Sequence, residues 1–196
     1  TTSAFSATQV ASLKVNKPAG MANGDVIVAG VVARGASQAT ITADTGWVQV
    51  RTDTPGTSQV SEVWRKVITD AAGEPVTYTW SFSVNSQAAI GISAYKDVDN
   101  TTPVDVSGGQ ENASSASVVA PAIVTTVANT MLFGHFSIQG ASLTFTHPTG
   151  MTERHDVTQS AGTDKCSGSG GDEAFVGPGS TGTRTATASA AGVNAG

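Results

Sequence analysis

Hydrophobic and polar residues alternate along most of this chain, and the clearest example is the segment VTYTWSFSV at residues 76–84. Valine and aromatic side chains occupy one set of alternate positions, and threonine and serine occupy the other. A period of two places successive side chains on opposite faces of a strand. The pattern therefore predicts a half-buried β-strand with an aromatic inner face and a hydroxyl-bearing outer face.

The same alternation predicts further strands, and no segment shows the 3.6-residue period of an amphipathic helix. Turn sequences such as KPAGMANGD and DAAGEP separate these strands. The further strands are predicted at residues 12–15, 26–33, 40–50, 58–68, 88–95, 115–120, 131–138, 143–146, 152–158 and 183–190. Many short strands punctuated in this way predict an all-β sandwich or barrel.

Two stretches of the chain resemble each other: ITADTGWVQVRTD at residues 41–53 and FTHPTGMTERHD at residues 145–156. A shift of 105 residues also places residues 19–35 over residues 124–140, with apolar positions over apolar positions. The matching blocks keep the same order along the chain. The sequence therefore predicts two copies of one multi-strand unit.

A shift of 106 residues places the alternating hydroxyl residues of 77–83 over those of 183–189. In the first copy an apolar strand follows at residues 87–95, but its counterpart begins near Val193 and the sequence stops at Gly196. Three explanations stay open: the sequence is shortened, the sheet keeps an open edge, or a neighbouring subunit donates the strand.

The two copies are predicted to interleave in one jelly-roll or Greek-key β-sandwich, a single domain over residues 1–196. The halves cover about residues 1–102 and 113–196, and residues 103–112 form the crossover loop between them. Two separate sandwiches are less favoured, because the second half has few aromatic residues for a core of its own.

The composition limits the partners that the chain can bind. Charged residues make up 13% of the chain, against about 25% in an ordinary soluble domain. The net charge is -5 and the ten basic residues are scattered, which argues against a nucleic-acid partner. No apolar run approaches the roughly 20 residues of a membrane span. Cys166, the single cysteine, excludes an internal disulfide and is expected to be a loop thiol.

Motifs for catalysis are missing: the sequence has no serine-hydrolase elbow, Walker motif or dinucleotide motif. The chain is therefore predicted not to be an enzyme and to need no cofactor. His147 and His155, with Asp156, form a weak metal candidate across a hairpin, but the equivalent turn of the first copy carries no ligand residue. Asp172 and Glu173 are expected to solvate a glycine-rich loop.

One acidic segment, KDVDNTTPVD, is a weak candidate for calcium. Its oxygen ligands would be Asp97, Asp99, Asn100 and Asp105, at the exit of a predicted strand. The spacing does not match an EF-hand loop, so an Asx-turn in the crossover loop is the favoured interpretation.

The three tryptophans suggest a surface for sugar stacking. Trp80 is assigned to the core by its place in the alternation. Trp64 shares a strand face with Glu62 and Lys66 and is predicted to be exposed, while Trp47 follows a turn glycine. Trp64 and Trp47 are therefore the candidate recognition residues for a glycan, with a core or sandwich-edge position as the alternative.

Six segments in order resemble a jelly-roll-type repeat of tailed-bacteriophage virion proteins and of secreted bacterial surface proteins. They are GDVIVAGVVARG, TGWVQV, SEVWRKVITDAAGEPVTYTWSFS, AIGISAYKDVDNTTPVD, PTGMTERHD and TGTRTATASA. The resemblance covers nearly the whole chain and implies a fold, because its motifs carry no catalytic residues. Members of this kind usually continue past the TGTRTATAS strand with another apolar strand, and this chain departs from them by ending at Gly196.

Two functions remain as hypotheses. The preferred one is a structural protein on a virion surface, such as a capsid decoration or a head or tail appendage, which contacts other virion proteins as a homo-oligomer or multi-copy assembly. The alternative is a secreted, extracellular carbohydrate-binding or adhesin-like module that uses Trp64 or the segment at residues 163–181. The N-terminal sequence TTSAFSATQV has no signal-peptide pattern, which fits either a virion protein or a module whose signal has been removed.

Overall fold

The computed structural model describes residues 1–159 and 162–196, and in these residues the chain forms β-strands and no helix. The strands of the first half are β1 (Thr2–Phe5), β2 (Val10–Asn16), β3 (Val26–Gly35), β4 (Ile41–Ala43), β5 (Val48–Asp53), β6 (Gln59–Val67) and β7 (Thr77–Tyr95). Those of the second half are β8 (Glu111–Ala120), β9 (Val124–Thr125), β10 (Thr130–Gln139), β11 (Phe145–Thr146), β12 (Thr152–Val157), β13 (Cys166–Phe175), β14 (Gly179–Ser180) and β15 (Arg184–Ala195). Among the described residues, none forms a helix suited to crossing a membrane.

Each half of the chain builds its own large antiparallel sheet, and the two sheets share one strand order. In the first sheet the order β7-β3-β6-β5 is joined by β1, β2 and β4, which all pair with β7. In the second sheet the order β15-β10-β13-β12 is joined by β8 and β11, which both pair with β15. Strands β9 and β14 form a small ribbon of their own. The shared strand order is what the predicted repeat of one multi-strand unit would produce.

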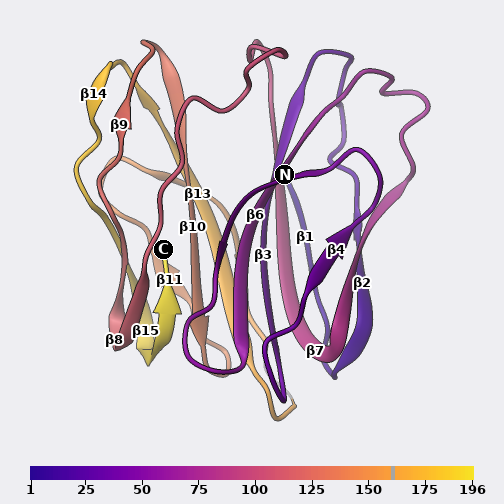
Figure 1. The fold of residues 1–196 in the computed structure, drawn as a ribbon, viewed down its shortest axis with the longest axis vertical. Helices are drawn as coiled ribbons and strands as arrows, with labels where there is room; N and C mark the ends of the chain where they lie inside the picture. The colour runs from indigo at the N-terminus through magenta and orange to yellow at the C-terminus, as the bar shows by residue number, and fades with distance from the viewer. Residues whose placement is uncertain (160–161) are drawn as a thin grey trace.

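The two large sheets pack face to face, with β13 against β3 and β7. Figure 1 shows β10 and β13 beside β3 and β6 in the middle of the molecule, with β2 at one margin and β14 at the other. The predicted all-β sandwich is confirmed. The expected interleaving of the halves is wrong, because every strand pair in the described chain joins strands of the same half. The jelly-roll connectivity stays a prediction.

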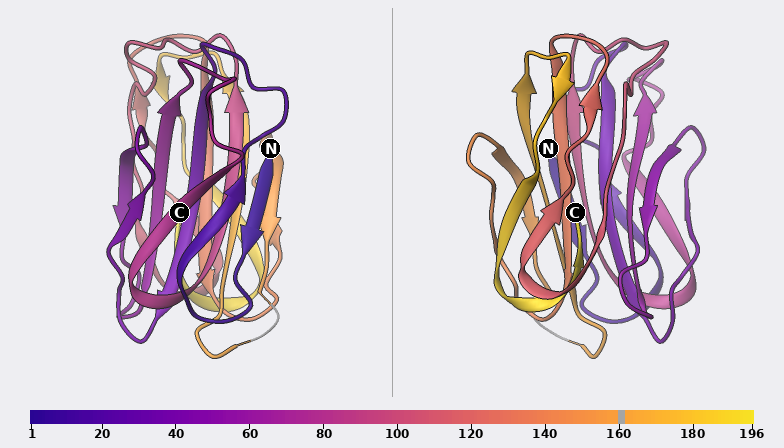
Figure 2. Two further views of the ribbon diagram at one scale, coloured as in Figure 1. Left: turned by 90° about the vertical axis from the view of Figure 1, so that its right-hand side faces the viewer. Right: turned by 60° about the vertical axis from the view of Figure 1, so that its left-hand side comes forward.

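Each half encloses a core of its own because its last strand bends over its sheet. Residues 76–84 and 88–95, predicted as two strands, are one strand, β7. The first part of β7 pairs with β2 and β4, and the second part pairs with β3 and β1. Tyr78 and Trp80 in the first part therefore share a core with Ile27 of β3. The same bend is visible in the long ribbons of Figure 2.

The second core is smaller than the first. Its buried members are Val118, Phe136, Ile138, Leu143, Phe145, Met151, Ala186 and Ala188. The shift of 106 residues pairs Trp80 with Ala186 and Phe82 with Ala188, so alanines stand where the first half has aromatic rings. A third, small cluster of Val32, Ala89, Val157 and Cys166 joins the two halves.

Strand β13 was missed by the sequence prediction, which placed a glycine-rich loop there. It pairs with β10 along ten residues and with β12 on its other side. A Cβ atom on Gly170 would lie 2.3 Å from Cε1 of His155, and one on Gly168 would lie 2.9 Å from Cγ1 of Val32. Gly168 and Gly170 lie on the same face of β13, and the close packing of Val32 and His155 against that face requires the glycines that suggested a loop.

Three other short strands, β1, β9 and β14, were also missed, and one predicted strand is divided. Residues 40–50 form β4 and the start of β5, separated by a turn in which Gly46 has a φ of 92°. A positive φ is readily adopted by glycine. The repeated Thr-Gly pair thus marks a turn between two strands in both halves, since Gly150 has a φ of 97°.

Candidate functional site

The most unusual feature of the second sheet is the unequal pairing of the two sides of β10. Along one side, all ten residues pair with β13. Along the other, only Ser137 and Ile138 pair with a strand, β15. In the described part of the chain, no strand therefore adjoins residues 130–136 on that side. The equivalent strand β3 pairs with β6 over nine residues and with β7 over ten.

A hollow of about 600 Å³ lies beside this unpaired part of β10. One wall is the edge of β10 itself, at residues 131–135, and the facing wall is the segment at residues 104–109. Val26, Val28 and Val63 of the first sheet form its floor. We call this hollow the β10 slot.

The wall opposite β10 is held in place by hydrogen bonds although it forms no strand. The Asp105 carboxylate accepts hydrogen bonds from the backbone amides of Thr126 at 2.7 Å and Val127 at 3.4 Å. The Arg51 guanidinium donates to the carbonyl oxygen of Gly109 at 2.7 Å. Hydrogen bonds from the Thr126 hydroxyl, the Thr126 amide and the Val127 amide keep the pKa of Asp105 below its usual value. The segment is thus fixed in position beside an empty space.

Large apolar side chains at the mouth of the slot are exposed. Val127 is 51% exposed, Met131 47% and Val176 76%, and all three line the slot. Single exposed apolar residues are ordinary on a protein surface, but a group of them around a hollow marks an interaction site.

Two arginines that line the slot are paired with carboxylates. Arg51 donates from Nε to Asp53 at 2.8 Å, and Arg184 donates from Nε to Glu173 at 3.0 Å. The slot therefore combines apolar side chains with charged ones, among them Arg65, Lys96 and Asp97.

The predicted calcium ligands do not gather into one site. The Asp99 carboxylate accepts from the amide of Thr101 at 2.8 Å, which is an Asx-turn, and the Asn100 amide donates to backbone carbonyls. Asp97 is exposed, with a φ of 59°. Asp105 is bound to the loop after β9, as described above. Among the described residues, no group of three or more His, Cys, Asp and Glu side chains is arranged to hold a metal ion.

The two candidate glycan residues lie against the first core. Trp47 is 8% exposed, and its ring lies 5.0 Å from that of Trp80 and 5.3 Å from that of Tyr78, between centroids. Trp64 is partly buried, packs against the same core and donates from Nε1 to Glu62 at 2.7 Å. Burial raises the pKa of the Glu62 carboxyl. Trp47 thus has the buried position that was the alternative to glycan recognition, and Trp64 is partly buried and not exposed as predicted. Neither ring has a fully exposed face on which a sugar could stack.

The histidines are buried where the two sheets meet. A Cβ on Gly30 of β3 would lie 2.3 Å from Nδ1 of His135, and one on Gly91 of β7 would lie 2.1 Å from Nε2 of His155. Each imidazole therefore occupies the space over a glycine of the opposite sheet. Burial lowers the pKa of His135 to about 4 and that of His155 to about 3. Both rings are neutral at pH 7.

His147 and Asp156, the other members of the weak metal candidate, have separate contacts. Nε2 of His147 lies 2.7 Å from the hydroxyl oxygen of Ser169, and burial lowers the pKa of this histidine. The Asp156 carboxylate accepts from the backbone amide of Phe145 at 2.9 Å, and burial raises its pKa. These contacts fix turns and strands of the second sheet.

The structure corrects the assignments made for the glycine-rich segment. Cys166 is fully buried in β13, and burial raises the pKa of its thiol to about 12, so the expected loop thiol is wrong. Asp172 is also buried; it accepts from the Tyr95 hydroxyl at 2.8 Å and from Arg154 at 2.7 Å. Glu173 pairs with Arg184. These carboxylates hold strands together, and Asp172 joins the two halves.

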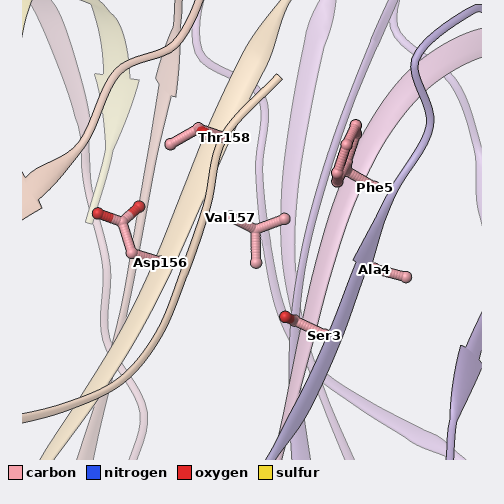
Figure 3. Close-up of a pocket in the computed structure, with 6 residues that line it drawn as sticks. All are labelled: Ser3, Ala4, Phe5, Asp156, Val157 and Thr158. Atoms are coloured by element: carbon pink, nitrogen blue, oxygen red, sulfur yellow. The ribbon is translucent and has the colours of Figure 1, made fainter. Parts of the chain in front are cut away.

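A second pocket, of about 460 Å³, lies between the edge strands β1 and β12. Figure 3 shows Ser3 and Val157 facing each other across it, while the Asp156 carboxylate points away toward the second sheet. Few polar atoms converge in this pocket, so it is a weaker candidate than the β10 slot.

Three residues that line the β10 slot, Asp97, Asp99 and Asp105, were singled out from the sequence as calcium candidates. The apolar part of the slot was not, and the signal that points to it is the repeat, since the shift of 105 residues places Met131 over Val26 and Leu132 over Ile27.

No family model, curated protein or solved structure matches this chain.

Proposed function

We propose that this chain is a non-enzymatic structural protein of a particle surface. The most specific form of the proposal is a bacteriophage virion protein, a capsid decoration or a head or tail appendage, that acts through sandwich packing and contacts between subunits. The observation that carries the proposal is the β10 slot, an apolar hollow with an unpaired strand edge, bordered by exposed Val127, Met131 and Val176.

The chemistry of the slot favours a polypeptide partner over a small substrate. Its walls are the edge of β10 and the backbone of residues 104–109, and Arg51 and Arg184 in its lining are each held by a carboxylate. An exposed strand edge is a template for another chain, and proteins that keep one usually cover it or use it. A surface of this kind suits a protein whose work is assembly.

The remaining surface agrees with such a role. The chain has few charged residues, a net charge of -5 and a high content of serine, threonine and glycine. A weakly charged, hydroxyl-rich β-sandwich is a rigid body that presents loops and edges to its neighbours. The resemblance of the sequence to virion proteins is the reason for proposing a virion as the particle. The β10 slot is the surface through which we propose that the protein contacts its neighbours.

The test is the native mass of the purified chain over a range of concentrations, compared with that of the variant Met131→Asp. The expected result is a multimer of the 19.6-kDa chain that dissociates when a charge is placed at the slot mouth. A chain that stays monomeric throughout and binds a glycan through Trp64, as shown by loss of binding in Trp64→Ala, would refute the structural role.

A further inference from the structure

The contact between the two large sheets is unlike the cores on either side of it. His135 of β10 lies over Gly30 of β3, and His155 of β12 lies over Gly91 of β7. Both imidazoles are buried. The apolar cluster around Cys166 completes the contact. Buried imidazoles over glycines thus replace apolar packing in part of this contact, which we call the sheet junction.

The two imidazoles lack hydrogen-bond partners. In the described residues, no protein group bonds to either ring nitrogen of His135 or His155. The backbone at Ser169 and Val31 favours the charged form of His135, but burial has the larger effect. Around His155, repulsion from the other two histidines and from the amino terminus adds to burial. Since a buried charge without a partner is costly, a proton on either ring opposes the contact between the sheets.

The charged groups of the junction do not offset such a proton. By their alternation, four strands carry charged or titratable side chains on the junction face: Arg34 of β3, Arg65 of β6, Tyr95 of β7 and Asp172 of β13. Tyr95 and Arg154 of β12 both donate to the Asp172 carboxylate. Arg34 donates to a backbone carbonyl at 3.0 Å. In the described chain, no carboxylate raises the pKa of either buried imidazole.

Each half keeps its own structure when the junction opens. Every strand ladder in the described chain joins strands of one half, and each half encloses its own core. Opening would break the hydrogen bonds that cross between the halves, such as that from Gln159 to the Ala88 carbonyl at 2.8 Å. These bonds hold the junction closed at neutral pH, but no ladder has to be broken for the sheets to separate.

We propose that the sheet junction is an acid-sensitive contact: protonation of His135 and His155 moves the two sheets apart while each half keeps its core and its ladders. Opening exposes the apolar cluster of Val32, Ala89, Val157 and Cys166, which is hidden at neutral pH. The inference does not depend on the proposed function, because it concerns only the contact within one chain.

Cys166 is the reporter for the test, because it is the single cysteine and is fully buried in the junction. Its reaction with a dithiodipyridine, a thiol reagent that works in acid, measures how often the junction opens; glutathione corrects for the reagent's own pH dependence. The pKa of each imidazole rises from about 4 or about 3 to about 6.5 on opening. Each histidine therefore makes opening about 25-fold more frequent at pH 5 than at pH 7, and both together about 500-fold.

Matched variants separate the contributions of the histidines. His135→Asn and His155→Asn each keep a flat polar side chain, and each should reduce the rise in reaction rate to about 25-fold. His147→Asn is the control, because His147 lies against Phe136 in the second half and stays there when the sheets part. This variant should keep the full rise. The fluorescence of the tryptophans in the first core should be the same at both pH values.

Two results in the unaltered chain would overturn the proposal, so it stays testable if a variant fails to fold. A rise of less than about tenfold between pH 7 and pH 5 would show that the imidazoles are not coupled to opening. A reaction rate that increases with urea as steeply as global unfolding does would show that Cys166 is exposed only when the whole chain unfolds. A shallower dependence on urea is expected.

Discussion

Strands β3 and β10 hold the same place in two sheets of the same plan, and their surroundings differ on one side only. Val26 at the start of β3 is 2% exposed, whereas its counterpart Met131 in β10 is 47% exposed. The difference follows from pairing: β7 covers β3 to its first residue, and β15 covers β10 only at Ser137 and Ile138. The comparison thus identifies where the two halves differ: the same position is covered by a strand in the first half and exposed in the second.

The largest expected effect comes from deleting matched core side chains on these two strands. Ile27→Ala should cost about 3 kcal/mol of unfolding free energy, because Ile27 is fully buried in the first core. Leu132→Ala at the matched position should cost about 1 kcal/mol, because Leu132 is partly exposed beside the slot. Chemical denaturation measures both, and equal losses would contradict the difference between the two strands.

An effect that is smaller for each side chain concerns the buried histidines between the halves. In the unfolded chain both imidazoles titrate near 6.5, while in the folded chain the pKa is about 4 for His135 and about 3 for His155. Below pH 6.5 the unfolded state binds protons at these imidazoles and the folded state does not. The free energy of unfolding therefore decreases as the pH falls. At pH 5 the loss should be about 2 kcal/mol for each histidine.

Urea unfolding at pH 7 and pH 5 measures this loss. The variant His135→Asn, which keeps a flat polar side chain over Gly30, should show a weaker pH dependence than the unaltered chain. Equal stability of the unaltered chain at both pH values would show that water reaches these rings and that the sheets are less tightly joined than the structure indicates.

The smallest effect concerns a single hydrogen bond between the halves. Tyr95→Phe removes the bond from the hydroxyl to Asp172, and about 1.5 kcal/mol should be lost. The matched control is Tyr78→Phe, whose hydroxyl donates to Glu74 at 2.9 Å within the first half. Only Tyr95→Phe should separate the thermal transitions of the two halves; identical calorimetric profiles would argue against Asp172 as a link between them.

The sequence predicted most of the fold where alternation was unbroken, as at residues 76–84. It failed at β13 because glycines required by the close approach of His155 and Val32 resemble a loop. A shift of about 105 residues carries β6 onto β13, so the repeat holds a signal for this strand. Asp172 was placed in a loop because the strand that holds it was not predicted.

The candidate site was predictable only in part, for a related reason. The repeat indicated which strands of the two halves correspond, but it could not show that β15 extends to Ala195 beside β10 or that residues 104–109 form the second wall of the slot. Those facts depend on contacts between residues far apart in the chain, such as Arg51 with Gly109. Likewise, Asp99 accepts a hydrogen bond from Thr101 in a local turn, and Asp105 accepts one from Thr126. The spacing of the acidic residues did not identify these partners.

Hydrogen exchange of the backbone amides in β3 and β10 tests the central claim, an open strand edge beside β10, most directly. Amides in a strand point alternately to the two neighbouring strands. In residues 131–136, every second amide should exchange fast, because it points into the slot, and the others should be protected by β13. The matched residues of β3 should all be protected. Uniform protection along β10 in the isolated chain would contradict the account, because it would mean that the edge is already closed.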